Sequence, residues 1–213
     1  MHICKKSSNF APFLLKKCRL ALFAGAFNER ASEKTNRTNN NINIDFMKPL
    51  NELTIAVASD HAGFGLKSMI LLYLEREGAK VIDFGCDSME NCDFPDYAHP
   101  MATAVEKGEC DLGIGFCYTG NGMSMAANTH PHVRATVCWE TRMAENARRF
   151  FDANVLCLPA GSVAPDKALD IIHSFVTTAF GGGERYERRI HHLANPNTYK
   201  IENGEWILIK EDK

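Results

Sequence analysis

The sequence lacks the features that mark several classes of protein. Its eight cysteines are scattered and no two form a C-x-x-C pair, so neither a zinc site nor a thioredoxin-like motif is expected. No apolar run approaches the roughly 18–20 residues that a membrane-spanning helix needs. With a formal net charge of −2, the chain lacks the excess of positive charge that binds nucleic acid or an anionic membrane surface. We therefore expect neither nucleic acid nor membrane as a partner.

What the sequence does contain is typical of one globular domain with appendages. Its 213 residues, 45% of them hydrophobic, are enough to bury a substantial core. Cys110, Cys117, Cys138 and Cys157 lie in or beside apolar runs, as reduced core cysteines of a cytosolic protein do. A disulfide-rich secreted scaffold is not expected for a chain with this much core. The predicted location is the cytoplasm.

The first 46 residues differ from the rest of the chain. They combine short apolar stretches with basic residues and an Asn-rich segment, and we interpret them as a disordered leader or as the product of a misassigned start. In the second case Met47 is the initiator. A signal peptide is the alternative, but Lys16, Lys17 and Arg19 interrupt the apolar core it would need. The expected divisions are a leader (1–46), a main domain (47–192) and a C-terminal extension (193–213).

From residue 53 onward, short apolar runs alternate with segments of helical periodicity. Strands are expected at 53–58, 80–84, 112–116, 134–138 and 154–158, and helices at 65–77, 96–107, 123–128, 140–149 and 165–180. Nearly uniform apolar strands that alternate with helices indicate a parallel sheet covered on both faces. Within the C-terminal extension, Asn203-Gly204 favours a tight turn, which predicts a small hairpin over 200–210.

The most informative stretch is 113–128, where an apolar strand ends at Cys117. A loop then supplies Gly120 and Gly122, and a helix-compatible run begins at Met123. Glycines allow main-chain N–H groups to approach a ligand closely, and a helix N-terminus adds partial positive charge. This pattern indicates an oxyanion pocket with a thiol at its rim, suited to proton transfer or nucleophilic chemistry at a carbonyl. An ordinary strand-to-helix turn around a buried cysteine explains the local pattern equally well.

A second polar loop is expected to meet the first. Asp60 and His61 follow the first strand, and the segment from Cys117 to Gly122 follows the third. In open parallel sheets, ligands bind outside the carboxyl ends of the strands, near the point where the strand order reverses. Two unrelated polar loops therefore converge on one crevice.

Four segments in collinear order resemble one enzyme family. They are Ser59–Gly63, Asp93–Tyr97, Cys117–Gly122 with Ala126–Asn128, and Asp152–Leu156. Together they are similar to the ribose-5-phosphate isomerase B and galactose-6-phosphate isomerase family, over about residues 53 to 192. The resemblance implies a flavodoxin-like, Rossmann-type α/β fold of three layers, with a five-stranded parallel sheet. It also implies a homodimer or dimer of dimers whose active sites are shared between subunits.

The resemblance implies a reaction without metal or other cofactor. Members of the family interconvert aldose and ketose phosphates through a cis-enediolate, and the residue matching the base is Cys117. A free thiol with a pKa of about 8.5 is a poor base at pH 7 until nearby N–H donors favour the thiolate. Thr119 matches a hydroxyl that moves protons between the two substrate oxygens. Some members use a glutamate at the position of Met123, and methionine cannot replace it.

The same resemblance assigns the substrate contacts. Asp60 matches a contact to a sugar hydroxyl, although it could equally cap the following helix. His61, Arg185 and Arg189 match the phosphate-binding residues; the two arginines, four residues apart, share one helix face and could otherwise form a solvated charged surface. The other positions expected at the substrate are Tyr97, Gly120, Asn121, Gly122, Ser124, Asn128 and Arg134.

Two departures from the family pattern bear on the substrate. Tyr118 stands where the family has a glycine, which narrows or reshapes the pocket. Phe150 and Phe151 stand where the family has His-Asn, and an aromatic ring cannot shuttle the proton that opens a cyclic sugar. The resemblance implies a substrate of the ribose 5-phosphate/ribulose 5-phosphate type. The two phenylalanines instead favour a short or acyclic substrate such as a tetrulose 4-phosphate, unless a histidine such as His99 or His132 substitutes.

Other functions remain open at this point. The chain could be a catalytically weak family member that serves as a binding or partner subunit, or an isomerase of an unphosphorylated sugar acid. A nucleotide-binding flavodoxin-like protein is disfavoured, because the loop Ser59–Gly63 is not a G-x-G-x-x-G phosphate loop.

Overall fold

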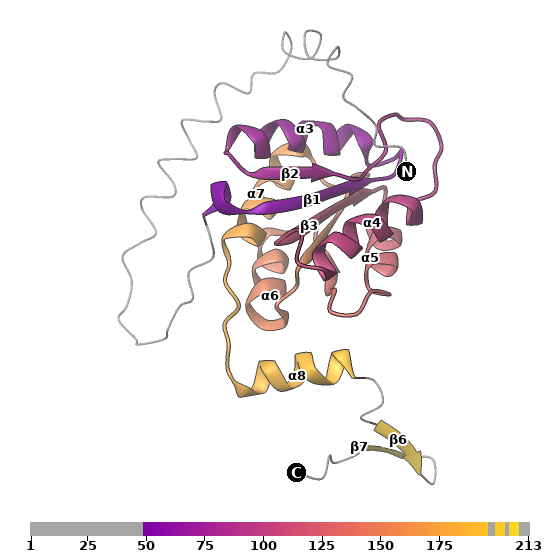
Figure 1. The fold of residues 1–213 in the computed structure, drawn as a ribbon, viewed down its shortest axis with the longest axis vertical. Coiled ribbons are helices and arrows are strands. Elements are labelled where there is room, and N and C mark those ends of the chain that lie inside the picture. Colours follow the sequence, from indigo (N-terminus) through magenta and orange to yellow (C-terminus); the bar gives the residue numbers. More distant parts are fainter. Residues whose placement is uncertain (1–48, 196–198, 203–204, 209–213) are drawn as a thin grey trace. The chain divides into compact units, whose positions relative to one another are not determined.

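A computed structural model describes residues 49–195, 199–202 and 205–208 (Figure 1). The predicted leader (1–46) lies outside the described residues, and so does part of the C-terminal extension. The strands of the main sheet are β1 (Thr54–Ser59), β2 (Lys80–Asp83), β3 (Leu112–Cys117), β4 (Ala135–Val137) and β5 (Val155–Pro159). The helices are η2 (Leu50–Glu52), α3 (Phe64–Arg76), α4 (Pro95–Glu106), α5 (Asn121–Ala127), α6 (Thr141–Phe151), α7 (Pro165–Thr177) and α8 (Glu184–Ala194).

The five strands form one all-parallel sheet in the order β2-β1-β3-β5-β4. The predicted α/β fold with a five-stranded parallel sheet is therefore confirmed. Compared with the flavodoxin order 2-1-3-4-5, the last two strands are exchanged. The chain moves outward from β1 in one direction to β2 and in the other direction to β3, so the strand order reverses between β1 and β3.

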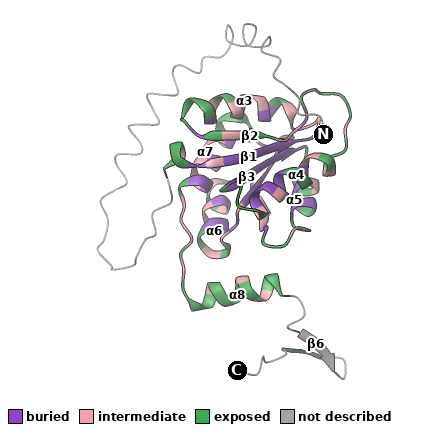
Figure 2. Ribbon diagram, viewed as in Figure 1, coloured by how far each residue is buried: buried purple, intermediate pink, exposed green. Residues whose placement is uncertain are grey.

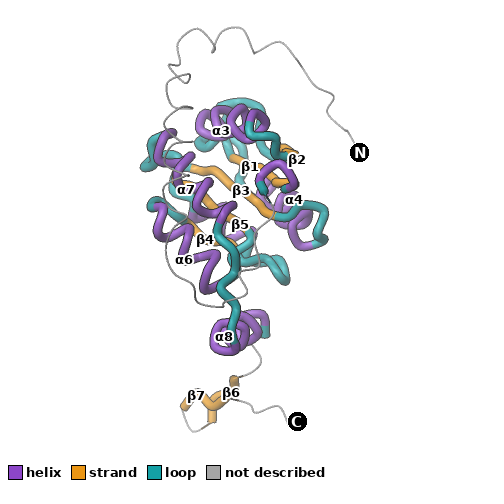
Figure 3. The backbone as a smooth tube through the Cα atoms, turned by 90° about the vertical axis from the view of Figure 1, so that its left-hand side faces the viewer, coloured by secondary structure: helices purple, strands orange, loops and turns teal. Residues whose placement is uncertain are grey.

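Residue alternation along the strands explains the two helical layers. Ile55, Val57, Ile114 and Leu156 share a core with residues of α3, α6 and α7 on one face. The other face carries smaller residues, beginning with Ala56 and Ala58, and packs against α4 and α5. Figure 3 shows the sheet between these helices, and Figure 2 shows that its central strands are buried. Cys117 belongs to the second face, so its side chain points toward the layer of α4 and α5.

The predicted helices α3 to α7 are all present, with ends up to three residues from the expected ones, and two of these differences have a clear cause in the backbone. Helix α5 begins at Asn121 rather than at Met123, because Gly120 takes a left-handed conformation (φ 76°) that starts the helix directly after the loop. Helix α7 ends at Thr177 rather than at residue 180, because Thr178 is extended. The Thr178 hydroxyl also donates a 2.6 Å hydrogen bond to the Ser174 carbonyl at this end.

The predicted hairpin near the C-terminus is confirmed as an antiparallel pair of strands, β6 (Tyr199–Glu202) and β7 (Glu205–Leu208). Its proposed turn, Asn203-Gly204, lies outside the described residues.

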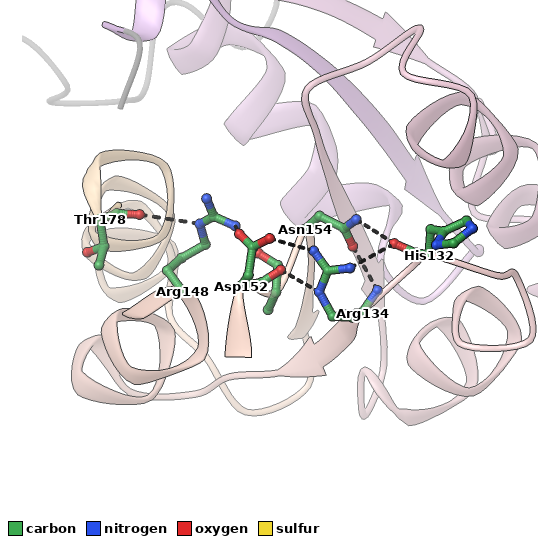
Figure 4. Close-up of polar contacts among 7 residues, drawn as sticks. His132, Arg134, Arg148, Asp152, Asn154 and Thr178 are labelled. Carbon is green, nitrogen blue, oxygen red and sulfur yellow. Dashed lines mark hydrogen bonds and ion pairs between the residues drawn. The ribbon is translucent and has the colours of Figure 1, made fainter. Parts of the chain in front are cut away.

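A charged network joins the amino ends of β4 and β5 (Figure 4). Asp152 lies between two arginines, with Oδ2 2.7 Å from Arg134 Nη2 and Oδ1 3.0 Å from Arg148 Nη1. Arg148 is buried and also donates to the carbonyls of Ala153 and Thr178. Burial lowers the pKa of the Arg148 guanidinium, and Asp152 opposes that effect. The network therefore fastens α6, α7 and the two strands at the edge of the sheet opposite the predicted crevice.

Candidate active site

The loops after β1 and β3 lie side by side at the carboxyl edge of the sheet. The Asp60 main-chain N–H donates to the Phe116 carbonyl at 3.2 Å. Gly63 packs so closely that a Cβ at this position would lie 2.4 Å from the same carbonyl oxygen, so no larger residue fits without a shift. This approach brings the polar residues that follow β1 next to the strand that ends in Cys117. The structure thus shows the convergence of the two loops that the sequence predicts.

Cys117 is the last residue of β3, and its side chain is 5% exposed. Its sulfur accepts a 3.0 Å hydrogen bond from the Gly120 N–H. That geometry depends on the left-handed Gly120, where a Cβ would also lie 3.0 Å from Val137 Cγ1. An N–H donor that points at sulfur suits a thiolate better than a thiol. The loop therefore holds Cys117 in a setting compatible with a base.

Thr119, Asn121 and Gly122 complete this loop. Thr119 is exposed, and its Oγ1 accepts a 3.3 Å hydrogen bond from the Asn121 N–H. Asn121 is exposed and Gly122 partly exposed at the start of α5. The Gly120 N–H thus contacts the Cys117 sulfur, and the Thr119 hydroxyl belongs to the same loop.

Asp60 does not cap α3, whose cap residue is Gly63, but it fixes the turn that precedes this helix. Its buried carboxylate accepts a 2.9 Å hydrogen bond from the Gly63 N–H, directly before α3. His61 Nδ1 lies 3.2 Å from both the main-chain nitrogen and the carbonyl oxygen of Cys92. In either tautomer, Nδ1 is thus occupied by the Cys92 main chain, and Nε2 is the ring atom left to contact a ligand.

Cys92 and Phe94 extend the site in a way the sequence did not predict. The Phe94 ring packs against Gly122, where a Cβ would lie 3.1 Å from the ring. Burial and a side-chain hydrogen bond with Cys92 raise the pKa of Tyr97. The segment from Cys92 to Tyr97 thus runs from His61 to the start of α5 and lies beside both loops at the carboxyl edge of the sheet. The sequence singled out the segment 93–97 only through its resemblance to the family, because an irregular loop has no periodicity that would predict these contacts.

Other predicted site residues are engaged elsewhere. The Asn128 side chain donates to the Ala135 carbonyl and accepts from the Ala135 N–H, at 2.9 Å and 2.7 Å. Ser124 Oγ also donates to this carbonyl, at 3.3 Å. Arg134 belongs to the Asp152 network at the opposite edge of the sheet. Their polar groups thus hold β4 in place, while the Ser124 N–H also donates to the Gly120 carbonyl in the loop that holds Cys117.

Arg185 and Arg189 are exposed on α8, and α8 contacts α6. The Tyr186 and Phe150 rings lie 5.2 Å apart, and the Gly181 N–H donates to the Arg149 carbonyl. These contacts are at the C-terminal end of α6, which leads into the amino end of β5. Within one chain, therefore, the two arginines are attached at the edge of the sheet opposite Cys117.

The three aromatic residues that differ from the family pattern have well-defined surroundings. Tyr118 is 66% exposed, and its ring lies over Gly161, in the loop that follows β5. Phe150 stacks on Tyr186, whereas Phe151 is 51% exposed. Tyr118 thus stands at the rim beside Cys117, and Phe150 packs against α8.

The neighbouring thiols are poor candidates for a base. Burial raises the pKa of Cys138 to about 11 and, together with the nearby Cys117, also raises the pKa of the fully buried Cys157. Both therefore stay protonated at neutral pH.

The part of the chain that the structure describes contains no group of three or more His, Cys, Asp or Glu side chains placed to hold a metal ion. Among the same residues, no helix is both long enough and apolar enough to cross a membrane.

The chain is similar to known sugar-phosphate isomerases over most of the described domain. The chain is 40% identical to ribose-5-phosphate isomerase B of Escherichia coli over 134 residues. The aligned residues cover 63% of this chain and 90% of that protein. It is 37% identical over 132 residues to D-erythrulose-4-phosphate isomerase of Pectobacterium atrosepticum, covering 62% of this chain and 87% of the relative.

Comparison of the fold with solved structures also identifies ribose-5-phosphate isomerases B as similar proteins. The structure of ribose-5-phosphate isomerase B from Clostridium thermocellum superimposes with a TM-score of 0.67 at 41% identity, over 68% of this chain and 97% of the other. The expected enzyme class, an aldose–ketose isomerase, is confirmed. The family model described as Ribose/Galactose Isomerase matches residues 55–193, and the chain belongs to that family.

Proposed function

We propose that the protein is a metal-independent isomerase of a sugar phosphate that works through a cis-enediolate, with Cys117 as the base. The observation that carries this proposal is the 3.0 Å hydrogen bond from the Gly120 N–H to the Cys117 sulfur. The loop of Asp60 and His61 supports it, because it is bonded to the end of the same strand. A base, N–H donors and a histidine then border one crevice.

These groups can carry out each proton transfer that the reaction requires. The Cys117 thiolate removes a proton from the carbon next to the carbonyl and returns it to the neighbouring carbon. The Gly120 and Asn121 N–H groups are already bonded to the Cys117 sulfur and to Thr119 Oγ1, so the Gly122 N–H, at the start of α5, stabilises the negative charge that develops on the enediolate oxygen. The Thr119 hydroxyl, exposed beside the thiol, transfers a proton between the two substrate oxygens.

The phosphate contacts require a second subunit. His61 offers Nε2, because the Cys92 main chain occupies Nδ1. Arg185 and Arg189 suit a phosphate dianion, but in one chain they are attached to the end of α6 away from the crevice. We therefore infer a homodimer, or a dimer of dimers, in which α8 of one subunit completes the site of the other.

Two substrate lengths are candidates. Relatives named for ribose 5-phosphate favour a pentose phosphate, and the relative named for D-erythrulose 4-phosphate favours a tetrose phosphate. Phe150 and Phe151 favour the shorter substrate, since neither ring can transfer the proton that opens a cyclic sugar. A tetrulose 4-phosphate carries phosphate on its terminal oxygen, cannot close a stable furanose and needs no such group.

The test is kcat/KM of the full chain for erythrulose 4-phosphate, ribose 5-phosphate, ribulose 5-phosphate, a hexose 6-phosphate, free ribose and a sugar acid. We expect turnover of a phosphorylated four- or five-carbon sugar and far weaker turnover of free ribose and the acid. A clear preference for ribose 5-phosphate would overturn the interpretation of the two phenylalanines. Equal turnover of an unphosphorylated substrate would overturn the phosphate assignment. Inactivity on every compound would favour a binding or partner subunit.

Shared sites can be tested by mixing two inactive variants. In a heterodimer of Cys117→Ala and Arg185→Ala, one site receives both Cys117 and Arg185 intact if the two residues come from different subunits. Co-refolding of the variants should then restore activity to about a quarter of the sites in a statistical mixture of dimers. If both residues served the same site from one chain, mixing would restore nothing.

The compartment we propose is the cytoplasm. The six cysteines that the structure describes are all free, as expected where thiols are kept reduced.

A further inference from the structure

The loop that begins at Cys117 is bonded to the turn that follows β5. The Ala160 N–H donates to the Cys117 carbonyl, and the Gly161 N–H donates to the Tyr118 carbonyl, each at 2.9 Å. In the sheet itself, the last pair between β3 and β5 joins Cys117 to Pro159. These hydrogen bonds therefore extend the contact between the two strands into the loops at the carboxyl edge.

The turn over residues 159–163 is fixed to the hydrophobic core. The N–H groups of Ser162 and Val163 both donate to the Pro159 carbonyl, at 2.9 Å and 3.0 Å. The Val163 side chain is buried in the core that the sheet shares with α3, α6 and α7, and Ala160 packs against the same core. This turn is therefore a firm support for a neighbouring loop.

Two residues of the Cys117 loop lie against this turn. A Cβ at Gly161 would lie 2.6 Å from Cε2 of Tyr118, and its three nearest atoms would all belong to that ring, so the ring lies directly on Gly161. A Cβ at Gly120 would lie 3.4 Å from the Pro159 nitrogen. Gly120 is also the residue whose N–H donates to the Cys117 sulfur at 3.0 Å. The donor to the sulfur and the Tyr118 ring therefore share one support.

We propose that Tyr118 is a positioning residue, whose contact with Gly161 keeps the Gly120 N–H on the Cys117 sulfur. The inference rests on the proposed role of Cys117 as the base. The Tyr118 side chain is 66% exposed, so it contributes little to the core and acts chiefly by joining two loops. A displacement of about 1 Å at a catalytic group can cost on the order of a hundredfold in rate, so a contact that fixes this loop bears directly on turnover.

The test measures kcat and KM of full-length variants on the best sugar phosphate. Tyr118→Ala removes the ring, whereas Gly161→Ala keeps it and adds a Cβ that displaces it from the turn. Gly161 does not have a positive φ, so alanine can adopt its backbone conformation. We expect kcat to fall about tenfold in each variant while KM changes less than about twofold, because the base is misplaced and the substrate contacts remain.

Two further variants separate this contact from a general loss of structure. Tyr118→Phe keeps the ring on Gly161 and should restore kcat to within about twofold of the parent. In the double variant, Tyr118→Ala with Gly161→Ala, the added Cβ no longer meets the ring. Its kcat should therefore equal that of Tyr118→Ala alone, since two changes that break one contact are not additive.

Hydrogen exchange of the Gly120 amide, followed by NMR, reports on the same contact without turnover. It should be faster in Tyr118→Ala and Gly161→Ala than in the parent, with exchange in β1 unchanged. The proposal is overturned if Gly120 exchanges at the parental rate in both variants, if the two losses of kcat add, or if only KM changes. Faster exchange at Gly120 supports the positioning role even if no sugar phosphate is a substrate, an outcome that would overturn only the proposed function.

Discussion

At the scale of single residues, one main-chain N–H determines the setting of the proposed base. Gly120 directs its N–H at the Cys117 sulfur from a left-handed conformation that L residues with a side chain rarely adopt. The carbonyl of Cys117 is fixed as well, by a 2.9 Å hydrogen bond from the Ala160 N–H. The base is thus held by main chain on both sides, which limits its freedom before substrate arrives.

Cys117→Ala tests this assignment. If the thiol is the base, kcat should fall by about 10²–10⁴-fold, the range typical of losing a general base, with KM largely unchanged. Cys138→Ala is the matched control, because that thiol is buried and its pKa is raised to about 11. Steady-state kinetics on the best sugar phosphate decide the matter. Similar kcat values for the parent and Cys117→Ala would contradict the mechanism.

Residue roles were predictable to different degrees. Cys117 ends an apolar run and precedes glycines, so its place at the end of a strand follows from the local sequence. The contacts between the Cys92 main chain and His61 Nδ1 join two irregular loops. No local sequence pattern predicts a contact of that kind. The hydrogen bonds of Asn128 to Ala135 were missed for the same reason, since they depend on how α5 approaches β4.

At the scale of elements, Asp152 joins two arginines at the amino edge of the sheet (Figure 4). Asp152→Asn keeps the shape and tolerates the left-handed backbone at φ 46°, but it leaves the buried Arg148 without its carboxylate. We expect a loss of about 2–3 kcal/mol in the free energy of unfolding, below the value for a fully buried pair because Asp152 is partly exposed. Urea denaturation measures this loss.

The control is Glu145→Gln, which breaks the exposed ion pair with Arg149 and should change stability by less than about 0.5 kcal/mol. Equal effects of the two substitutions would contradict a special role for the buried network.

Helix α8 has no buried residue, and the ring contact between Tyr186 and Phe150 attaches it to α6. Phe150→Ala should therefore accelerate hydrogen exchange across 184–194 and leave the exchange of β3 unchanged. Phe151→Ala is the matched control, because that ring is half exposed. Exchange in α8 that is identical in both variants would show that other contacts hold the helix.

The positions of the elements were predictable because each strand of the sheet is a short, nearly uniform apolar run. The order of the strands in the sheet was not predictable. The apolar runs of β4 and β5 would read the same whichever of the two strands lay at the edge. The end of α7 was overestimated because the apolar run continues past Thr178, whereas the extended backbone there stops the helix.

At the scale of the whole molecule, buried thiols link stability to pH. Burial raises the pKa of Cys138 from 9.0 to about 11. Above the lower value the unfolded chain releases this proton while the folded protein retains it, so stability is full below pH 9 and falls as pH rises toward 11.

We expect urea denaturation at pH 10.5 to show the parent losing about 1–2 kcal/mol more than Cys138→Ala loses, relative to pH 8. The variant should keep part of the alkaline loss, because burial also raises the pKa of Cys157. Identical losses in both proteins would contradict the assignment to Cys138.

The pairing of β1 with β3 has a consequence for how the protein folds. In register these strands place Ile55 beside Leu112, although β2, α3 and α4 lie between them in the chain. Closing so long a loop costs chain entropy before the apolar contacts compensate, which makes this a slow step. The loops that carry His61 and Cys117 meet only after that closure. During synthesis the nascent chain therefore has no assembled site until β3 has left the ribosome and inserted beside β1.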